Sequence, residues 1–466
     1  MAKSSIFRVL DHCKISPPPN SSPPTTLPLT FLDIPWLFFS PSQPLFFYEY
    51  SHSTSHFISS TLPNLKHSLS LALNHFFPFL GNLVISPCDS YKPKIVYTSG
   101  DFVSFSVVES SGDFRFFTSN HGRDVHEFYP LVPELGTHSV ATGKEGFIPL
   151  LAVKVTIFPQ MGICIGLAFH HVAADGRTFN NFIKGWASLC ANSCFLFNSS
   201  PSFDRSVIKD EYGLEEIFLK ELWKRKSSQE MVIGTETHVD LSNMVRATFV
   251  VSSLDMEKIK KWIISKCKKK GQPLPIHLSP YVLTCSFTWV CLVKAQTQKD
   301  QLENYHSEED PIHFGFIAGG LTRLDYRIPA SYFGNCVGFG RSTASRRELK
   351  GEDGIIVAAN VIGDMIKKLD REIFCGAERW ILDWEVLFGS EIHVMVSGSP
   401  KLNLYETDFG WGRPKKIEEI SIDKSRAISL TESRDVESGI EVGLALHESE
   451  MEVFSSFFVE GLKILQ

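Results

Sequence analysis

The stretch FHHVAADGRTF, residues 169–179, lies where the hydrophobic pattern of the chain changes. Before it, apolar residues alternate over residues 151–157 and again over residues 163–169, with turn residues between them, which predicts a β-hairpin. After it, apolar residues recur at helical spacing: Phe179, Phe182, Ile183, Trp186 and Cys190. The stretch is therefore predicted to be a corner between a strand and a helix, with Asp175 and Gly176 as its turn residues.

Two adjacent histidines occupy this corner. Neighbouring side chains on a strand point to opposite faces, so His170 and His171 are poorly placed to share one metal ion. His171 continues the apolar face and has small neighbours, so one nitrogen of its ring can face a cavity. An imidazole with an ordinary pKa of about 6.5 is largely neutral at pH 7, as a general base must be. The same local context also fits a core histidine that is bonded to a backbone carbonyl. The residues of the corner do not decide between these two interpretations.

Asp175 follows His171 by four residues, across the predicted turn. We expect it to fix the loop through an arginine or backbone amides rather than to move a proton. A second H-x-x-x-D match, residues 306–310, lies in a charged stretch without apolar neighbours and is interpreted as a solvated surface. The setting of the motif, and not its spacing, therefore distinguishes the two matches.

Two further stretches combine glycine with aromatic residues. In DFGWG, residues 408–412, two glycines flank a tryptophan, which requires tight backbone geometry and favours a structural role. SYFGNC, residues 331–336, is interpreted as another turn, with an aromatic pair. The chain has no G-x-S-x-G elbow, no P-loop and no glycine fingerprint for dinucleotides, so these enzyme classes gain no support.

The composition is that of a globular protein large enough for two domains. The chain has 466 residues, of which 43% are hydrophobic and 21% charged. The formal net charge of -6 gives no support for nucleic-acid binding. Ten scattered cysteines without a CxxC pair argue against a disulfide framework. We find no apolar signal segment at the N-terminus and no run long enough to span a membrane, so a reduced, cytoplasmic protein is expected.

The motifs HHVAADG (residues 170–176), YFGNC (residues 332–336) and DFGWG (residues 408–412) together resemble, in order and spacing, those of the plant acyl-CoA-dependent acyltransferases called the BAHD family. The resemblance extends over nearly the whole chain, from the opening SPPP…LPLTFLD to the closing SLTESRD…GIEVGLAL. HxxxDG alone is shared with chloramphenicol acetyltransferase-like proteins. YFGNC further resembles the branch that acylates sugar hydroxyls of anthocyanins and other flavonoid or phenolic glucosides.

The resemblance implies an α/β fold of two similar chloramphenicol acetyltransferase-like domains, each a mixed β-sheet with helices. The expected division is residues 1–205, which carry HxxxDG, a crossover linker at residues 206–240, and residues 241–466, which carry YFGNC and DFGWG. The active site would lie in a channel between the two domains. Acyl-CoA would enter this channel from one side and the acceptor from the other.

By the same resemblance, His171 is the base at the centre of the channel, Asp175 is structural, and Ser397 supplies a donor for the oxyanion. His171 would take a proton from an acceptor hydroxyl, whose oxygen would attack the thioester carbonyl and expel the CoA thiolate. No metal and no resident cofactor is implied, since acyl-CoA is a co-substrate. The expected partners are acyl-CoA and a phenolic glucoside, bound by a monomer without nucleic acid or membrane. The remaining motif residues, of which DFGWG is mainly structural and near the CoA side, are Gly176, Tyr332, Phe333, Gly334, Asn335, Cys336, Asp408, Phe409, Gly410, Trp411 and Gly412.

The acyl donor and the residues that bind it stay open. Lys258, Lys260 and Lys261 are candidates for the phosphates of CoA, although a solubilising helix face explains them equally well. Arg177 either faces a malonyl carboxylate or is an exposed residue of the first helical turn. The many aromatic residues suit a hydroxycinnamoyl donor or an ordinary core, and general similarity favours the aromatic acyl donors.

One segment departs from the family. Where BAHD proteins usually show D-x-R-x-R before YFGNC, residues 319–323 are GGLTR, without the aspartate and the first arginine. Asp175 then either lacks an arginine partner or uses Arg323. This departure motivates a second hypothesis, a non-catalytic relative that binds acyl-CoA or a partner. A metal-dependent hydrolase is the third.

Overall fold

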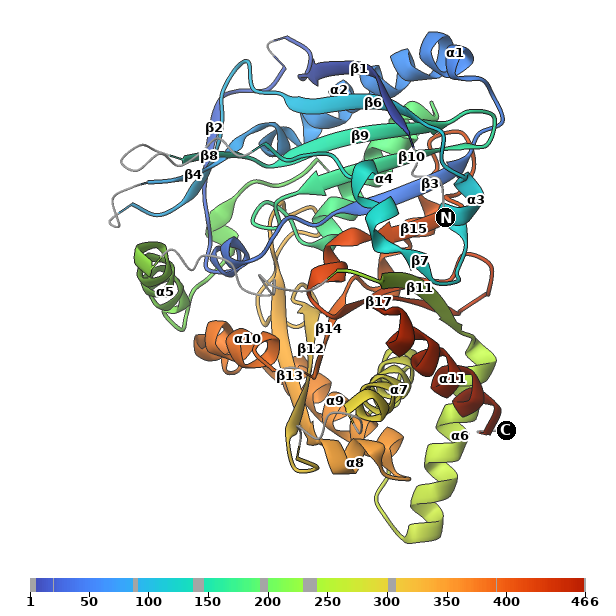
Figure 1. Cartoon of the computed structure of the whole chain (residues 1–466). Helices are drawn as coiled ribbons and strands as arrows, with labels where there is room; N and C mark the ends of the chain where they lie inside the picture. The colour runs from blue at the N-terminus through green and yellow to red at the C-terminus, as the bar shows by residue number, and fades with distance from the viewer. Residues whose placement is uncertain are drawn as a thin grey trace.

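The computed structural model contains two large mixed sheets, one built mainly by the first half of the chain and the other mainly by the second (Figure 1). In Figure 1 the first sheet lies above the second, and helices pack on both. The residues that the structure describes are 6–19, 21–86, 91–136, 146–192, 200–228, 241–300, 307–390 and 392–464.

The first sheet has six strands, in the order β1 (Phe7–Ile15), β6 (Val103–Ser110), β9 (Leu151–Phe158), β10 (Gly162–Phe169), β3 (Pro44–Glu49) and β15 (Lys416–Glu419). Only β6 and β9 are parallel neighbours in it. The predicted hairpin is confirmed as β9 and β10. β10 is buried along its whole length, because one face meets the main core and Phe114 and Phe117 cover the face that carries Cys164.

The second sheet has seven strands, in the order β13 (Val337–Ser345), β12 (Pro311–Gly319), β14 (His393–Ser397), β16 (Ala427–Glu432), β17 (Ile440–His447), β11 (Met244–Val251) and β7 (Arg123–Asp124). Three helices pack against it: α7 (Pro280–Asp300), α9 (Gly354–Arg371) and α11 (Glu448–Ile464) (Figure 1). Their apolar side chains belong to a buried core that continues into the first sheet. The two halves of the molecule therefore share one hydrophobic core.

Each sheet takes one edge strand from the other half of the chain. β15 follows DFGWG in the sequence, yet it pairs with β3 at the edge of the first sheet. β7 belongs to the first half of the chain, yet it pairs with β11 at the edge of the second sheet. The two domains predicted from the sequence are thus joined by strand pairing in both directions.

Buried charges connect these exchanged strands. The guanidinium groups of Arg123 and Arg246 donate to the carboxylate of Glu418 at 2.7 and 3.1 Å. Arg246 also donates to Asp423 at 3.0 Å. These four side chains are at most 2% exposed, so two arginines offset two carboxylates away from water.

A smaller sheet of four strands lies at one end of the first, in the order β2 (Thr25–Pro28), β5 (Lys94–Tyr97), β4 (Asn82–Ile85) and β8 (Gly146–Pro149) (Figure 1). The other helices are α1 (Thr54–His56), α2 (Leu62–His75), α3 (Phe114–Thr118), α4 (Gly176–Cys190), α5 (Leu214–Ser228), α6 (Ser253–Lys270), α8 (Arg346–Lys350) and α10 (Trp380–Phe388). α5 lies in the predicted linker, of which residues 229–240 are outside the described residues. Across the described ranges, no helix combines the length and the apolar character that crossing a membrane requires.

Candidate active site

The predicted corner between strand and helix is present at residues 170–175. β10 ends there in a tight turn, and α4 begins with Asp175 as its N-cap residue. The Oδ1 atom of Asp175 accepts a hydrogen bond from Thr178 N at 2.8 Å, which satisfies a backbone amide at the helix start. Turn and cap together fix the backbone on both sides of His171.

The imidazole of His171 lies against the indole of Trp36, with ring centroids 3.8 Å apart and planes 20° apart. Its Nδ1 is buried and has no hydrogen-bond partner among the described residues, although the residue as a whole keeps some exposed surface. A core histidine fixed by a backbone carbonyl would have a bonded ring nitrogen at this position. An unbonded ring nitrogen is what the general-base interpretation requires, and that role of His171 stays a prediction.

The charge state of His171 is set by opposing influences. Burial lowers the pKa of His171 to about 4, while the nearby carboxylates of Asp175 and Asp33 act in the opposite direction. At pH 7 the imidazole is thus neutral, which is the state that can accept a proton. The carboxylates favour the cation that a proton transfer to the ring would create.

The carboxylate of Asp175 is committed to the protein backbone. Besides its bond from Thr178 N, Asp175 accepts a hydrogen bond at Oδ2 from Cys336 N at 3.1 Å. The side chain is 4% exposed, and Arg177 Nη2 lies 3.6 Å from Oδ2. Asp175 therefore joins α4 to the YFGNC segment, in the manner that the sequence predicted.

The guanidinium of Arg177 is also hydrogen-bonded to the YFGNC region. Its Nη1 donates to Ala330 O at 2.7 Å and its Nη2 to Tyr332 O at 2.9 Å. The side chain is 23% exposed, so it is neither a free surface group nor fully enclosed. Arg177 connects the start of α4 to the loop before β13.

Both sequence-based alternatives for the cation beside Asp175 are wrong. Arg323 pairs with Asp370 at 3.0 Å, and Asp175 is not left alone, because Arg177 occupies that position. The cation beside Asp175 is thus the residue two positions further along the chain, at the start of α4. It does not come from the segment before YFGNC. Sequence spacing did not reveal this, since it does not specify the direction of a long side chain in the first helical turn.

YFGNC brings the second half of the chain to His171. The side-chain amide of Asn335 donates from Nδ2 to His171 O at 3.0 Å. Thr178 Oγ1 donates to Gly334 O at 3.1 Å. Gly334 has a φ of 142°, and a Cβ there would lie 2.3 Å from Arg205 Nη1, so the motif requires glycine at this position.

Sequence reasoning missed three residues beside this segment: Asp33, Trp36 and Arg205. Arg205 Nη1 donates to Tyr332 Oη at 2.7 Å and to Phe333 O at 3.0 Å. Asp33 did carry a signal, because it is a carboxylate inside the apolar run LTFLDIPWLFF. Trp36 and Arg205 carried none, since their contacts come from distant parts of the chain.

DFGWG docks the second half of the chain onto the first. The Oδ1 atom of Asp408 accepts hydrogen bonds from the backbone amides of both motif glycines, at 2.7 and 2.9 Å. Phe409 meets Trp186 of α4 edge-on at 4.9 Å and stacks on Trp411 at 5.5 Å. Tyr48 of β3 contacts both motif aromatic rings at 5.7 Å. These contacts favour the structural role predicted for the motif.

Ser397 and the candidate lysines lie on other elements. Ser397 is the last residue of β14, in the second sheet. Lys258, Lys260 and Lys261 lie on α6, which extends to the lower end of the molecule in Figure 1. Lys258 and Lys261 pair with acidic residues of the same helix at 3.6 and 3.9 Å. An oxyanion role for Ser397 and a CoA role for these lysines stay predictions.

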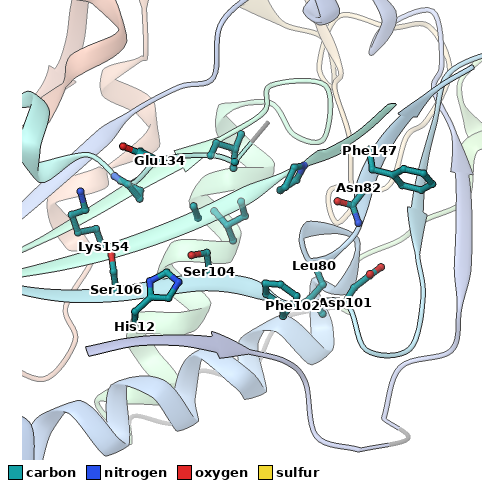
Figure 2. A pocket seen from close by; sticks show the side chains of 16 residues that line it. His12, Leu80, Asn82, Asp101, Phe102, Ser104, Ser106, Glu134, Phe147 and Lys154 are labelled. Carbon is teal, nitrogen blue, oxygen red and sulfur yellow. The ribbon is translucent and has the colours of Figure 1, made fainter. Parts of the chain in front are cut away.

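A cavity of about 690 Å³ opens on the outer face of the first sheet (Figure 2). His12, Ser104 and Ser106 line it from β1 and β6, and Lys154 reaches it from β9. Lys154 Nζ is already bonded there to two backbone carbonyls. Because His171 is absent from the described residues that line this cavity, the cavity is separate from the corner that carries the motif.

The described part of the chain holds no group of three His, Cys, Asp or Glu side chains arranged to bind a metal ion. His170 Nδ1 accepts a hydrogen bond from Val172 N at 3.5 Å. Burial lowers the pKa of His170 to about 4, with a contribution from His171. The donor set that a metal-dependent hydrolase needs is thus not found among these residues.

A family model described as the Transferase family matches residues 13–460. The chain belongs to this family, the BAHD transferases. This BAHD protein is 37% identical to the malonyl-coenzyme A:anthocyanin 3-O-glucoside-6''-O-malonyltransferase of Dahlia pinnata, over 98% of the chain and 97% of that relative. It is 36% identical to coumaroyl-CoA:anthocyanidin 3-O-glucoside-6''-O-coumaroyltransferase 1 of Arabidopsis thaliana, with 98% and 97% covered. The prediction of an acyl-CoA-dependent acyltransferase of this family is confirmed.

Solved structures with the same architecture support the predicted fold class. Vinorine synthase superposes with a TM-score of 0.68 at 18% identity, over 96% of each chain. F. sporotrichioides TRI101, complexed with coenzyme A and T-2, gives a TM-score of 0.64 at 13% identity, over 91% of this chain and 96% of that one. The predicted α/β fold of two mixed-sheet domains is therefore confirmed for this BAHD protein.

Proposed function

We propose that this BAHD protein transfers an acyl group from CoA to a sugar hydroxyl of a flavonoid, anthocyanin or other phenolic glucoside, with His171 as the general base. Relatives at 36–37% identity are named for anthocyanin glucosides and for malonyl or coumaroyl donors. The observation that carries the proposal is the buried Nδ1 of His171, which has no hydrogen-bond partner among the described residues and lies on a backbone fixed by its own corner and by Asn335 of YFGNC.

The reaction follows from the neutral imidazole of His171. His171 takes the proton of the acceptor hydroxyl while the oxygen attacks the thioester carbonyl, which gives a tetrahedral oxyanion. The oxyanion then collapses, the carbon–sulfur bond breaks, and the imidazolium of His171 gives its proton to the departing CoA thiolate, which restores the neutral base. Between these steps the imidazolium is stabilised by the π face of Trp36 and by the nearby carboxylates.

Ser397 remains our candidate donor for the oxyanion. It ends β14, and the following Gly398 has a φ of 77°, which turns the backbone immediately after the strand. One well-aimed donor of this kind typically contributes ~3 kcal/mol to stabilising an oxyanion transition state.

For the acyl donor we propose a hydroxycinnamoyl group. The Arg177 donors are occupied by the carbonyls of Ala330 and Tyr332, which leaves its guanidinium poorly available to a malonyl carboxylate. Aromatic side chains gather beside His171, where Trp36 contacts Phe39 at 5.5 Å and Trp384 at 5.9 Å between ring centroids. The nearly equal identities to malonyl and coumaroyl transferases do not separate the donors, so the argument rests on these side chains.

For the phosphates of CoA, the cations near His277 are a second set of candidates beside the lysines of α6. Burial lowers the pKa of His277, and Lys367, Arg323 and Lys401 add to that effect by repulsion while Asp370 opposes it. Lys367 and Arg323 both pair with Asp370, at 3.1 and 3.0 Å, just as Lys258 and Lys261 pair with acidic residues of α6. Pairing therefore does not separate the two sets of candidates.

We further propose that the protein acts as a cytoplasmic monomer without a metal or resident cofactor. One chain supplies both halves of the site, since Asn335 and His171 come from different sheets of the same molecule. General-base transfer from a thioester needs no metal step.

The test is release of CoA thiol by the purified full-length chain. p-Coumaroyl-CoA and malonyl-CoA are supplied separately, each with a panel of flavonoid and anthocyanin glucosides. We expect acceptor-dependent release with p-coumaroyl-CoA, and a kcat reduced by about 10²–10⁴-fold in His171→Ala. The second H-x-x-x-D match offers a control, because His306→Ala is expected to retain wild-type kcat.

Other outcomes separate the alternatives. Release with malonyl-CoA alone would contradict the proposed donor. Folded protein that releases no thiol with either donor would favour the non-catalytic relative. Acceptor-independent release that a chelator abolishes would favour the hydrolase.

A further inference from the structure

Asp33 is a fully buried carboxylate beside the candidate active site. Its relative exposure is 0%, and it lies in the apolar run that precedes the 3₁₀ helix η1 (Ile34–Phe38). Its Oδ2 accepts hydrogen bonds from Thr30 N at 2.9 Å and from Thr30 Oγ1 at 2.7 Å. A carboxylate in such a place is costly unless every acceptor site is used, so its partners should matter.

The other oxygen of Asp33 faces YFGNC. Oδ1 accepts from Asn335 N at 3.1 Å and from Asn335 Nδ2 at 2.9 Å. The same Nδ2 group has a second proton, and it donates this proton to His171 O at 3.0 Å. Asp33 Oδ1 and His171 O are both acceptors only, so the amide of Asn335 must present its NH₂ group to both. A chain of two hydrogen bonds thus runs from Asp33 to the backbone of His171.

A buried arginine balances the charge of Asp33. Arg205 Nη1 lies 3.5 Å from Asp33 Oδ2, and the arginine side chain is 12% exposed. The same nitrogen donates to Tyr332 Oη and Phe333 O, as described above. Asp33 therefore connects three segments that are distant in the sequence: its own run, the start of the crossover and YFGNC.

The position of Asp33 also affects the other side of the imidazole. Asp33 is the residue immediately before η1, and η1 carries Trp36, whose indole stacks on His171. One buried carboxylate is thus connected to His171 twice, through Asn335 to its backbone and through η1 to the ring that covers its face. A small displacement of Asp33 would move both supports.

We propose that Asp33 is a positioning residue for the general base, holding Asn335 so that Asn335 fixes the main chain of His171. The inference rests on the proposed role of His171 as the base. Asp33 itself does not touch the substrate or move a proton. Its carboxylate also favours the imidazolium, but the proposed effect is on the orientation of the imidazole, and a misplaced base slows the chemical step more than it weakens substrate binding. Asn335→Ala separates the two effects, because it keeps the carboxylate of Asp33.

The main test compares Asp33→Asn with wild type in steady-state kinetics, using the full-length chain and the substrates that wild type turns over. An asparagine at position 33 has one carboxamide oxygen, so its NH₂ group must face the donors of either Thr30 or Asn335. The hydrogen bonds from that residue are then lost. We expect kcat to fall about 10²-fold, with KM for both substrates within about threefold of wild type. Thr30→Val is the matched comparison, because it removes one donor to Oδ2 while Thr30 N still bonds that oxygen and Asn335 keeps its bonds to Oδ1, so the loss of kcat should be smaller than in Asp33→Asn.

Asn335→Ala tests the same link from its other end and serves if Asp33→Asn does not fold. It removes the bond to His171 O but leaves Asp33 bonded to Thr30 and paired with Arg205. We expect the same pattern of reduced kcat and unchanged KM. An Asn335→Ala enzyme with wild-type kcat would overturn the proposal.

The double variant Asp33→Asn, Asn335→Asp distinguishes positioning from simple stability. The amide now at position 33 can donate to the carboxylate at position 335, but that carboxylate has no proton for His171 O. We expect kcat to stay low even where the melting temperature recovers. Recovery of kcat together with stability would show a purely structural role.

Failure of the inference is separable from failure of the proposed function. Loss of turnover in His171→Ala establishes the base first. Normal kcat in Asp33→Asn would then overturn only the positioning role, whereas full turnover in His171→Ala would overturn the proposed function itself.

Discussion

The imidazole of His171 and the indole of Trp36 lie face to face, although His171 lies in the turn after β10 and Trp36 belongs to η1. Their centroid separation of 3.8 Å is close enough for the π face to stabilise positive charge on the imidazole. Burial favours the neutral ring that begins the reaction, and the indole favours the cation that forms during it. The two effects act on different protonation states of one side chain.

Replacing Trp36 tests this charge stabilisation. A cation–π contact contributes about 0.5–2 kcal/mol, so Trp36→Leu is expected to lower kcat by about 2- to 30-fold. Trp36→Phe keeps a smaller aromatic face and should lose less. Steady-state kinetics of both variants decide the matter, and equal losses would indicate that the indole acts by packing alone.

The pH profile of kcat/KM tests the protonation state of His171. Because burial lowers its pKa to about 4, the base stays unprotonated at pH values where an exposed histidine is charged. We expect kcat/KM to be flat from pH 8 down to about 5.5 and to fall only as pH approaches about 4. Asp175→Asn removes a carboxylate that raises this pKa, so its acid limb should lie at still lower pH. An acid limb near 6.5 in the wild type would contradict the buried neutral imidazole.

Asp175→Ala is expected to lower stability and activity together. It removes the helix cap at Thr178 N and the bond from Cys336 N, and it leaves Arg177 without its carboxylate. The expected loss in the free energy of unfolding is roughly 2–4 kcal/mol, measured by urea denaturation.

A second helix cap provides the control for this change. Ser252 caps α6 through a capping box, so Ser252→Ala should cost about 1 kcal/mol and leave kcat unchanged. Loss of activity in Asp175→Ala without loss of stability would instead assign Asp175 a direct part in the chemistry.

Arg246→Met tests the buried charges between the exchanged strands. The substitution leaves Glu418 and Asp423 with one cation fewer in a region without water. Breaking such a pair from one side is expected to cost about 3–5 kcal/mol in the free energy of unfolding. Lys415→Met, which removes an exposed pair with Glu49, should cost at most about 1 kcal/mol. Similar losses in both variants would show that burial of the network is unimportant.

The parts of the fold that depend on local pattern were predictable from the sequence. The hairpin of β9 and β10 follows from alternation, α4 from helical spacing, and the turn at Asp175 from its place between them. The end of α6 follows from local chemistry in the same way, since Gly271 has a φ of 62°, a conformation that favours glycine.

The parts that depend on distant contacts were not predictable in this way. No periodicity indicates that β15 pairs with β3, since the pairing partner lies in the other half of the chain. The stacking of Trp36 on His171 was not predictable for the same reason, because these two residues are distant in the sequence. The sequence indicated the position of Arg177 but not its contacts. A flexible side chain at the start of a helix can extend in several directions.

The exchange of edge strands imposes an order on synthesis. β3 has no partner on its outer edge until residues 416–419 emerge from the ribosome, long after β3 itself. During that interval its unpaired backbone groups are a surface on which other chains can add. The edge of β3 therefore stays open through most of translation, and a chain that stops before residue 335 lacks the amide that bonds to His171 O.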